Sequence, residues 1–287
     1  MRAYEDWVVL AENKGLKISQ VVLLNQIEEL EIPEQALLER MGKNLKVMRE
    51  SVNMGLSGNR RSVSGLVGGD AAKIEARRKS GLTLLGAPLS GAIARALAVA
   101  EVNASMGRIV AAPTAGSCGV LPAVLLTLEE ILGVGETELL SALFTAAGLG
   151  MVITDRANVS GAEGGCQAEI GSAAAMSAAA AVELAGGSPR QTADGAAIAL
   201  KSMLGLVCDP VAGLVEVPCV KRNATGAMIA LTAAEMALSG VKSAIPIDEV
   251  IDTMAEIGQQ MSCSLKETAQ GGLAMTPTGR KIRADFL

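Results

Sequence analysis

Three cysteines stand in settings that suit chemistry as well as packing. Cys166 lies in a Gly-rich segment, and Cys208 and Cys219 each lie within two residues of a proline. Turn-forming residues between long apolar runs indicate that three distant loops assemble one site. An iron–sulfur cluster with four thiolates is usually an electron carrier, whereas one with three leaves an iron free for substrate. The alternative is that these thiols are small buried hydrophobes.

The residues around each of the three cysteines favour metal binding more than the intervals between the cysteines do. Cys166 is expected at the start of a helix, where the dipole and free N–H groups favour a thiolate. The interval between Cys208 and Cys219 is rich in Pro and Gly, so a rigid excursion can bring both thiols to one cluster. No spacing matches the ferredoxin CxxCxxC run. Of the other cysteines, Cys263 is expected to be a buried small hydrophobe and Cys118 receives no role.

Histidine is missing from the 287 residues. This excludes Ser-His-Asp and Cys-His nucleophiles and His-ligated zinc within this chain alone. A reaction that needs an imidazole base must take it from another subunit.

Charge and hydropathy exclude further classes of protein. The net charge of −5 and pI of about 5.1 argue against nucleic-acid binding. The apolar run 170–184 is mostly Ala and contains Glu183, so it is expected to be a buried helix and not a membrane span. The acidic start of the chain does not resemble a signal peptide. We therefore expect a cytoplasmic protein with reduced cysteines.

Composition and periodicity predict an all-α fold. Half of the residues are hydrophobic but 1% are aromatic, so the core is expected to consist of Ala, Leu, Val, Ile and Met in closely packed helices. The best strand candidate is the short segment 108–112. We expect an N-terminal helical arm (1–50) packed on a helical main body (51–287), with the loops that carry the singled-out residues between its helices. Apolar periodicity predicts the main helices at 34–50, 90–106, 123–132, 138–152, 170–185, 192–206, 224–238 and 247–262.

Two loops between the predicted helices contain residues suited to binding. Residues 51–81 are rich in Ser and Gly, and exposed backbone N–H groups in such loops suit carboxylate or phosphate oxygens. The segment matches neither GxxxxGK[ST] nor a GxGxxG that follows a strand, so a flexible linker is an equal alternative. The second loop, 112–122, is a turn between two prolines.

These residues together carry a family resemblance. The loops of Cys166, Cys208 and Cys219, with intervals of 42 and 11 residues, the segment Pro113–Gly116 and the Ser/Gly loop ending in Gly68-Gly69-Asp70 resemble the alpha chain of iron–sulfur-dependent bacterial L-serine dehydratase. The resemblance covers nearly the whole chain. It implies an oxygen-sensitive [4Fe–4S] cluster on the three cysteines, an all-helical catalytic domain, and conversion of L-serine to pyruvate and ammonia in amino-acid degradation and gluconeogenesis.

The resemblance also implies a heteromer. The family occurs in fused and split forms, and a chain of this length resembles the split form, in which an L-serine dehydratase beta chain is a separate partner. Histidines of that beta chain are the expected bases. Single-chain relatives end with a cysteine that can occupy the open iron, whereas the tail here has none, so self-capping is not expected. Candidate substrate-binding residues are Ser62, Ser64, Asn103, Thr114 and Lys221.

Two alternatives stay open at this level. A pyridoxal-phosphate dehydratase would need a Schiff-base lysine and an α/β fold, which the helical pattern opposes. A non-catalytic iron–sulfur scaffold or electron carrier would be redox-active and would consume no serine.

Overall fold

The chain is mainly helical over residues 3–286, the part that the computed structural model describes. No strand forms in this part; Cys208 and Lys266 make one isolated bridge. The prediction of an all-α fold is confirmed. The helices are α1 (Tyr4–Lys14), α2 (Ile18–Leu30), α3 (Glu34–Leu56), α4 (Asp70–Lys79), α5 (Gly86–Ala104), α6 (Val120–Leu132), α7 (Glu136–Arg156), α8 (Gly161–Gly164), α9 (Ser172–Leu184), α10 (Pro189–Lys201), α11 (Cys219–Leu238), α12 (Ile247–Gln260) and α13 (Pro277–Phe286).

The predicted helices form with shifted ends. α3 begins after Pro33 as expected but continues beyond residue 50 to Leu56. Gly58, two residues after the end of this helix, takes a left-handed conformation (φ 73°). The strand candidate 108–112 forms neither strand nor helix. The division into an arm (1–50) and a body (51–287) stays a prediction, and α3 crosses residue 50 without a break.

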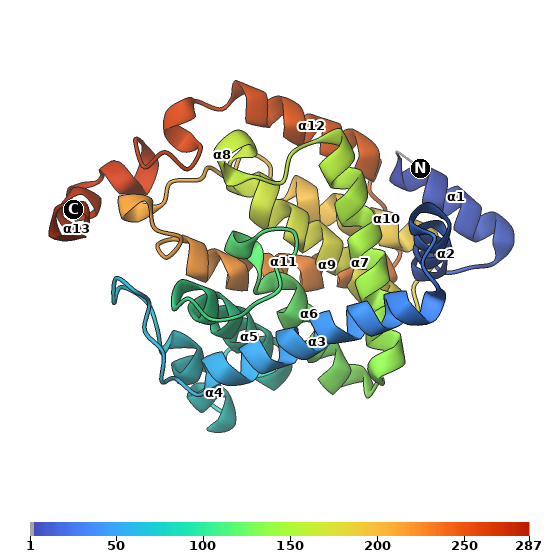
Figure 1. Cartoon of the computed structure of the whole chain (residues 1–287), viewed down its shortest axis with the longest axis horizontal. Helices are drawn as coiled ribbons and strands as arrows, with labels where there is room; N and C mark the ends of the chain where they lie inside the picture. Colours follow the sequence, from blue (N-terminus) through green and yellow to red (C-terminus); the bar gives the residue numbers. More distant parts are fainter. Residues whose placement is uncertain (1–2, 287) are drawn as a thin grey trace.

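Helix α9 lies in the middle of the molecule (Figure 1). Every residue from Ser172 to Glu183 is buried, and most are Ala. Helices α6, α7, α10 and α11 all contact it. Because Ala side chains are short, these neighbours approach α9 closely on all sides, which explains how a core forms with few aromatic residues. The apolar run 170–184 is thus a buried helix, as expected.

Two glycines permit close contacts outside α9. A Cβ added to Gly55 on α3 would lie 2.2 Å from the backbone oxygen of Ala98 on α5. A Cβ on Gly148 of α7 would lie 2.3 Å from Cζ3 of Trp7 on α1. Glycine at these positions brings α3 against α5 and seats the indole against α7.

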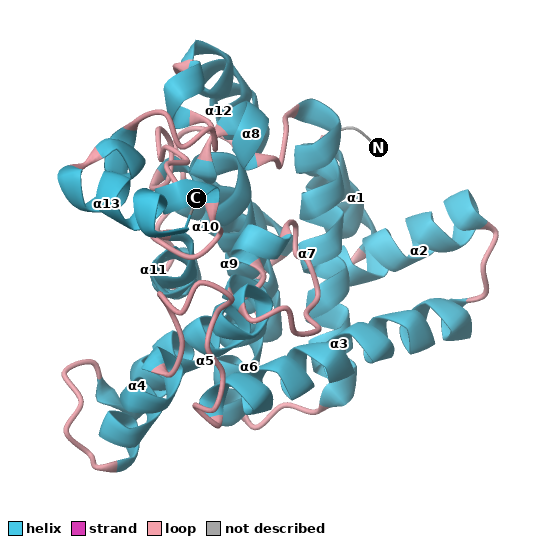
Figure 2. Ribbon diagram, turned by 60° about the vertical axis from the view of Figure 1, so that its left-hand side comes forward, coloured by secondary structure: helices cyan, strands magenta, loops and turns pink. Residues whose placement is uncertain are grey.

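The N-terminal helices pack on the side of the molecule away from the C-terminus (Figure 1). Helices α2 and α3 project side by side (Figure 2). Tyr4 and Trp7 of α1 are buried in the main apolar cluster. Asp248 of α12 accepts hydrogen bonds from the backbone N–H groups of Tyr4 and Glu5, at 2.9 and 3.0 Å. α12 thus caps the start of α1.

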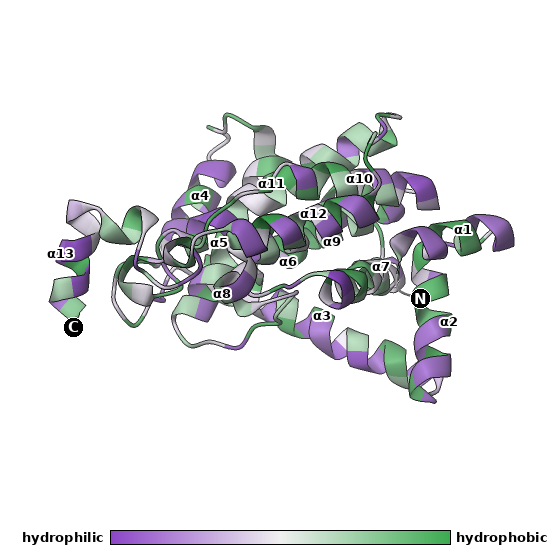
Figure 3. Ribbon diagram, turned by 90° about the horizontal axis from the view of Figure 1, so that it is seen from above, coloured by the Kyte–Doolittle hydropathy of each residue, from purple (hydrophilic) through white to green (hydrophobic). Residues whose placement is uncertain are grey.

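Two helical stretches are long and apolar enough to cross a membrane by length and composition, Ala115–Leu132 and Glu136–Arg156. In the most apolar 18-residue window of each, 61% of the residues are buried inside the fold, as expected of core helices. The outer helices α4 and α12, by contrast with these two apolar stretches, carry hydrophilic residues among their hydrophobic ones (Figure 3). A cytoplasmic location stays an expectation.

Candidate functional site

The three singled-out thiols come to one place from three separate loops. Cys166 follows α8, Cys208 follows α10, and Cys219 is the first residue of α11. All three are buried, with at most 7% of each residue exposed. Burial raises the pKa of Cys208 most, and negative charge on Cys166 or Cys219 would raise it further, so the three sulfurs lie near one another. The sequence reasoning named these three residues together, and the fold brings them together.

Backbone hydrogen bonds tie the thiol loops to one another. The N–H of Gln167 donates to the oxygen of Leu206 at 2.9 Å, which joins the Cys166 loop to the Cys208 loop. The Gln167 side chain is fully buried and braces the same junction: its amide donates to Met254 and its oxygen accepts from the N–H of Gly205. The short π-helical turn Gln167–Gly171 begins here. Such turns are frequent at functional sites.

Burial keeps the three thiols protonated in the absence of a metal. It raises the pKa of Cys166 to about 11 and that of Cys219 to about 12. It raises the pKa of Cys208 further, with Cys166, Glu169 and Cys219 adding to the shift. A metal that binds these sulfurs must displace the protons.

The three thiols are the type of donor that iron–sulfur clusters use. Within residues 3–286, no three His, Cys, Asp or Glu side chains are placed to hold one metal ion. In an iron–sulfur cluster each thiolate binds its own iron, so the ligands can lie further apart. Three thiols on three loops, with no histidine, suit a cluster held by sulfur ligands.

Arg222 is the cation beside the thiols. It donates to the backbone oxygen of Val207 at 2.8 Å and to Oδ1 of Asp209 at 3.0 Å. Its positive charge also lowers the pKa of the Cys166 thiol, against the larger effect of burial. The neighbouring Lys221, a predicted substrate-binding residue, pairs instead with Asp70 at 3.3 Å and is 65% exposed.

Glu169 faces the thiols, and the sequence reasoning did not single it out. Its Oε1 accepts a 2.7 Å hydrogen bond from Oγ1 of Thr114, a predicted substrate-binding residue. Burial raises the pKa of Glu169, the Thr114 bond lowers it, and the charge of Glu267 raises it again. Its position one helical turn after Cys166 was the available signal.

The other predicted substrate-binding residues lie around the same site. Ser62 and Ser64 hydrogen-bond each other, and Ser64 donates at 2.5 Å to Oε2 of Glu216 in the excursion between Cys208 and Cys219. Asn103 donates to the oxygen of Ala115 at 3.2 Å. Their contacts with substrate stay predictions, but the Ser/Gly loop does touch the thiol loops.

Asn223 joins two parts of the site and was also missed. It is 1% exposed. Its Oδ1 accepts from the N–H of Gly119, and its Nδ2 donates to the oxygens of Gly116 and Cys219, at 2.8, 2.8 and 3.1 Å. One side chain therefore fixes the Thr114–Gly119 loop to the helix turn that carries Cys219.

The two remaining cysteines are not among the groups whose charge acts on the three thiols. Cys118 is fully buried, with its sulfur 4.0 Å from the oxygen of Val99. Cys263 is exposed, so the expectation of a buried small hydrophobe is wrong. α12 ends at Gln260, before Cys263, and leaves it in a surface turn that continues to Leu265.

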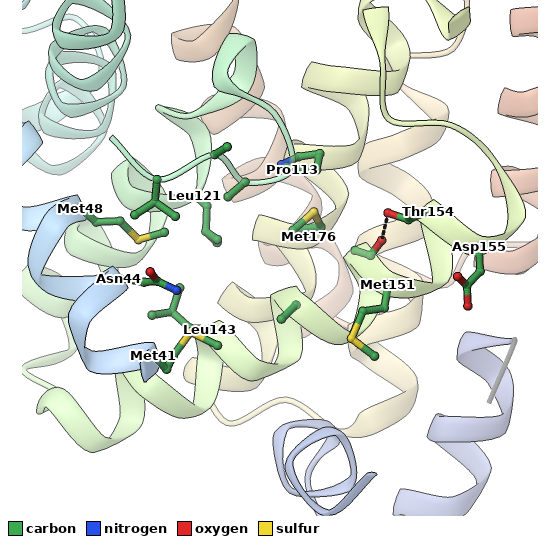
Figure 4. A pocket seen from close by; sticks show the side chains of 15 residues that line it. Met41, Asn44, Met48, Pro113, Leu121, Leu143, Met151, Thr154, Asp155 and Met176 are labelled. Carbon is green, nitrogen blue, oxygen red and sulfur yellow. Dashed lines mark hydrogen bonds between the residues drawn. The ribbon is translucent and has the colours of Figure 1, made fainter. Parts of the chain in front are cut away.

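An apolar cavity of about 380 Å³ lies next to the Thr114 loop but contains none of the three thiols. Pro113 forms part of its wall, and methionines from α3, α7 and α9 (Met41, Met48, Met151 and Met176) supply much of the lining (Figure 4). The polar groups at its edge are Asn44, Thr154 and Asp155. The residues that line this cavity include no cysteine and one carboxylate, whereas the thiol site gathers three cysteines, carboxylates and an arginine.

Fold and site together define a class: a helical protein whose inter-helix loops present three buried thiols at one place, with carboxylates and one arginine around them. The family model described as serine dehydratase alpha chain matches residues 13–274. The chain belongs to this family.

Named relatives agree with the family match. A probable L-serine dehydratase, alpha chain, of Bacillus subtilis is 51% identical over 281 residues, which cover 98% of this chain and 93% of the relative. The L-serine dehydratase, alpha chain, of Peptoniphilus asaccharolyticus is 43% identical over 278 residues, 97% and 95% of the two chains. An L-serine dehydratase of Streptomyces coelicolor is 40% identical over 280 residues, 96% of this chain but 60% of that longer protein.

Proposed function

We propose that this chain is the catalytic alpha subunit of an L-serine dehydratase, a lyase that converts L-serine to pyruvate and ammonia. The observation that carries the proposal is the convergence of Cys166, Cys208 and Cys219 in a chain whose relatives bear that name. The reaction removes the α-proton and the β-hydroxyl as water. The resulting aminoacrylate tautomerises to an imine, which water hydrolyses to the two products.

We infer that the three cysteines hold a [4Fe–4S] cluster. When bound, such a cluster with three thiolate ligands supplies a Lewis-acidic iron that stabilises departing hydroxide. The chain itself supplies the ligands, the positive charge of Arg222 beside Cys166, and the hydrogen-bonding groups of the Thr114 loop and the Ser62–Ser64 turn. Those groups orient the substrate, which raises the rate because a positioned substrate has little entropy left to lose.

The base for the α-proton is proposed to come from a beta chain. This chain has no histidine. A partner that docks over the Thr114 and Ser62 loops would supply an imidazole and exclude water from the site.

The test is anaerobic purification of this chain with its candidate beta chain, followed by a pyruvate assay on L-serine. We expect pyruvate from the complex and none from this chain alone. Cys208→Ala should abolish both activity and the broad visible absorption of the cluster. The matched control is Cys263→Ala, which removes an exposed thiol and should change neither.

Each part of the proposal has its own contrary result. Activity retained in Cys208→Ala would contradict the cluster, and full activity of the isolated chain would contradict the borrowed base. A sharp aldimine band would indicate pyridoxal phosphate instead, and a redox-active complex that consumes no serine would indicate an electron carrier.

A further inference from the structure

The Glu169 carboxylate lies in a slot between two glycines. A Cβ added to Gly116 would lie 2.9 Å from Oε1, and a Cβ added to Gly161 would lie 2.7 Å from Oε2. The Cβ at Gly161 would also lie 3.1 Å from the sulfur of Cys208. Any side chain at either glycine would crowd the carboxylate, so the two glycines leave room for it beside Cys208.

The two oxygens of Glu169 have different surroundings. Oε1 accepts the hydrogen bond from Thr114, the only one that Glu169 receives from another side chain within residues 3–286. This bond fixes the carboxylate and leaves Oε2 directed toward Gly161 and Cys208. Glu169 is partly exposed, so its carboxylate is not sealed in the core.

The charges around Glu169 favour a cationic ligand. Cys166, Cys208 and Cys219 all experience its charge, and Glu267 adds a second carboxylate. Arg222 is the nearby cation, but its guanidinium donates to Val207 and Asp209. Oε2 would repel the carboxylate of a ligand and attract an ammonium group, which would also compensate a carboxylate held out of water.

We propose that Oε2 of Glu169 binds the α-ammonium group of the substrate, with Thr114 holding the carboxylate in the required orientation. This inference rests on the proposed function, because it concerns the same amino-acid substrate. It assigns specificity: an α-amino acid gains a charge-assisted hydrogen bond that a carboxylic acid without the amino group lacks. The reacting hydroxyl is then placed by its neighbouring ammonium group.

The test compares two ligands that differ by the ammonium group alone. L-Alanine and propanoate have no hydroxyl to eliminate, so both can be titrated calorimetrically into the cluster-loaded complex with its beta chain. In the wild type we expect L-alanine to bind more tightly than propanoate. Glu169→Gln keeps the size but loses the charge, and it should weaken L-alanine binding about 10- to 100-fold and propanoate binding less than about threefold. The KM for L-serine should rise with the L-alanine dissociation constant.

The matched control is Glu163→Gln on α8, an exposed carboxylate that hydrogen-bonds Asn158. It should leave both dissociation constants unchanged. The inference is overturned if Glu169→Gln weakens the two ligands equally with a changed visible spectrum, which would indicate a structural role. It is also overturned if kcat falls while both dissociation constants hold, which would indicate proton transfer. If the wild-type complex forms no pyruvate from L-serine, the proposed function is refuted. The dissociation constants of L-alanine and propanoate would still show whether Glu169 binds an ammonium group.

Discussion

Replacing Asn223 by Ala is expected to loosen the site more than any single exposed polar change. Gly119 is buried, and Oδ1 of Asn223 is the acceptor for its N–H. Leaving that N–H unpaired costs about 1–3 kcal/mol, and each of the bonds to Gly116 and Cys219 is worth about 0.5–1.5 kcal/mol. The expected loss is therefore about 2–6 kcal/mol, out of the roughly 5–15 kcal/mol that stabilise a typical domain.

The assay is urea unfolding of the cluster-free chain, followed by circular dichroism under reducing conditions. The matched control is Asn103→Ala, which removes one hydrogen bond to the same loop from a partly exposed side chain. Its expected cost is below about 1 kcal/mol. If Asn223→Ala costs no more than Asn103→Ala, Asn223 does not hold the Thr114–Gly119 loop to the Cys219 helix, and the reasoning fails. Iron bound per chain, measured after reconstitution, should fall with Asn223→Ala alone.

Two further predictions concern the scaffold. On α3, Gly42→Ala should stabilise the chain by up to about 1 kcal/mol, because nothing lies within 4 Å of the new Cβ. Gly55→Ala on the same helix should destabilise it by about 1–3 kcal/mol through the clash with the backbone of Ala98; equal unfolding midpoints for the two variants would contradict the described packing. On α1, the hydrogen bond from Arg190 holds the pKa of Glu5 below its ordinary value of 4.5. Its stabilisation is therefore present above pH 4.5 and is lost as the pH falls through the lowered folded-state pKa. Because both side chains are more than 40% exposed, Glu5→Gln should lose less than about 1 kcal/mol at pH 7. The difference from wild type should vanish in acid unfolding curves; a difference that persists at pH 2 would refute this account.

Much of the fold was predictable because helical signals are local. Proline before α3 and α12, Ala-rich runs and 3.6-residue periodicity place helices without knowledge of their neighbours. The short strand candidate 108–112 failed because a strand needs a partner, and none forms in the described chain.

The sequence by itself determined the composition of the site: three thiols in turn-forming loops, no histidine, and small side chains that favour closely packed helices. Only the tertiary structure decided which polar residues face the thiols. Lys221 and Arg222 are neighbours, but successive residues on a helix point about 100° apart, so one pairs with Asp70 and the other with Asp209. Glu169 meets Thr114 across 55 residues of chain, and such pairings depend on how helices pack and not on local sequence.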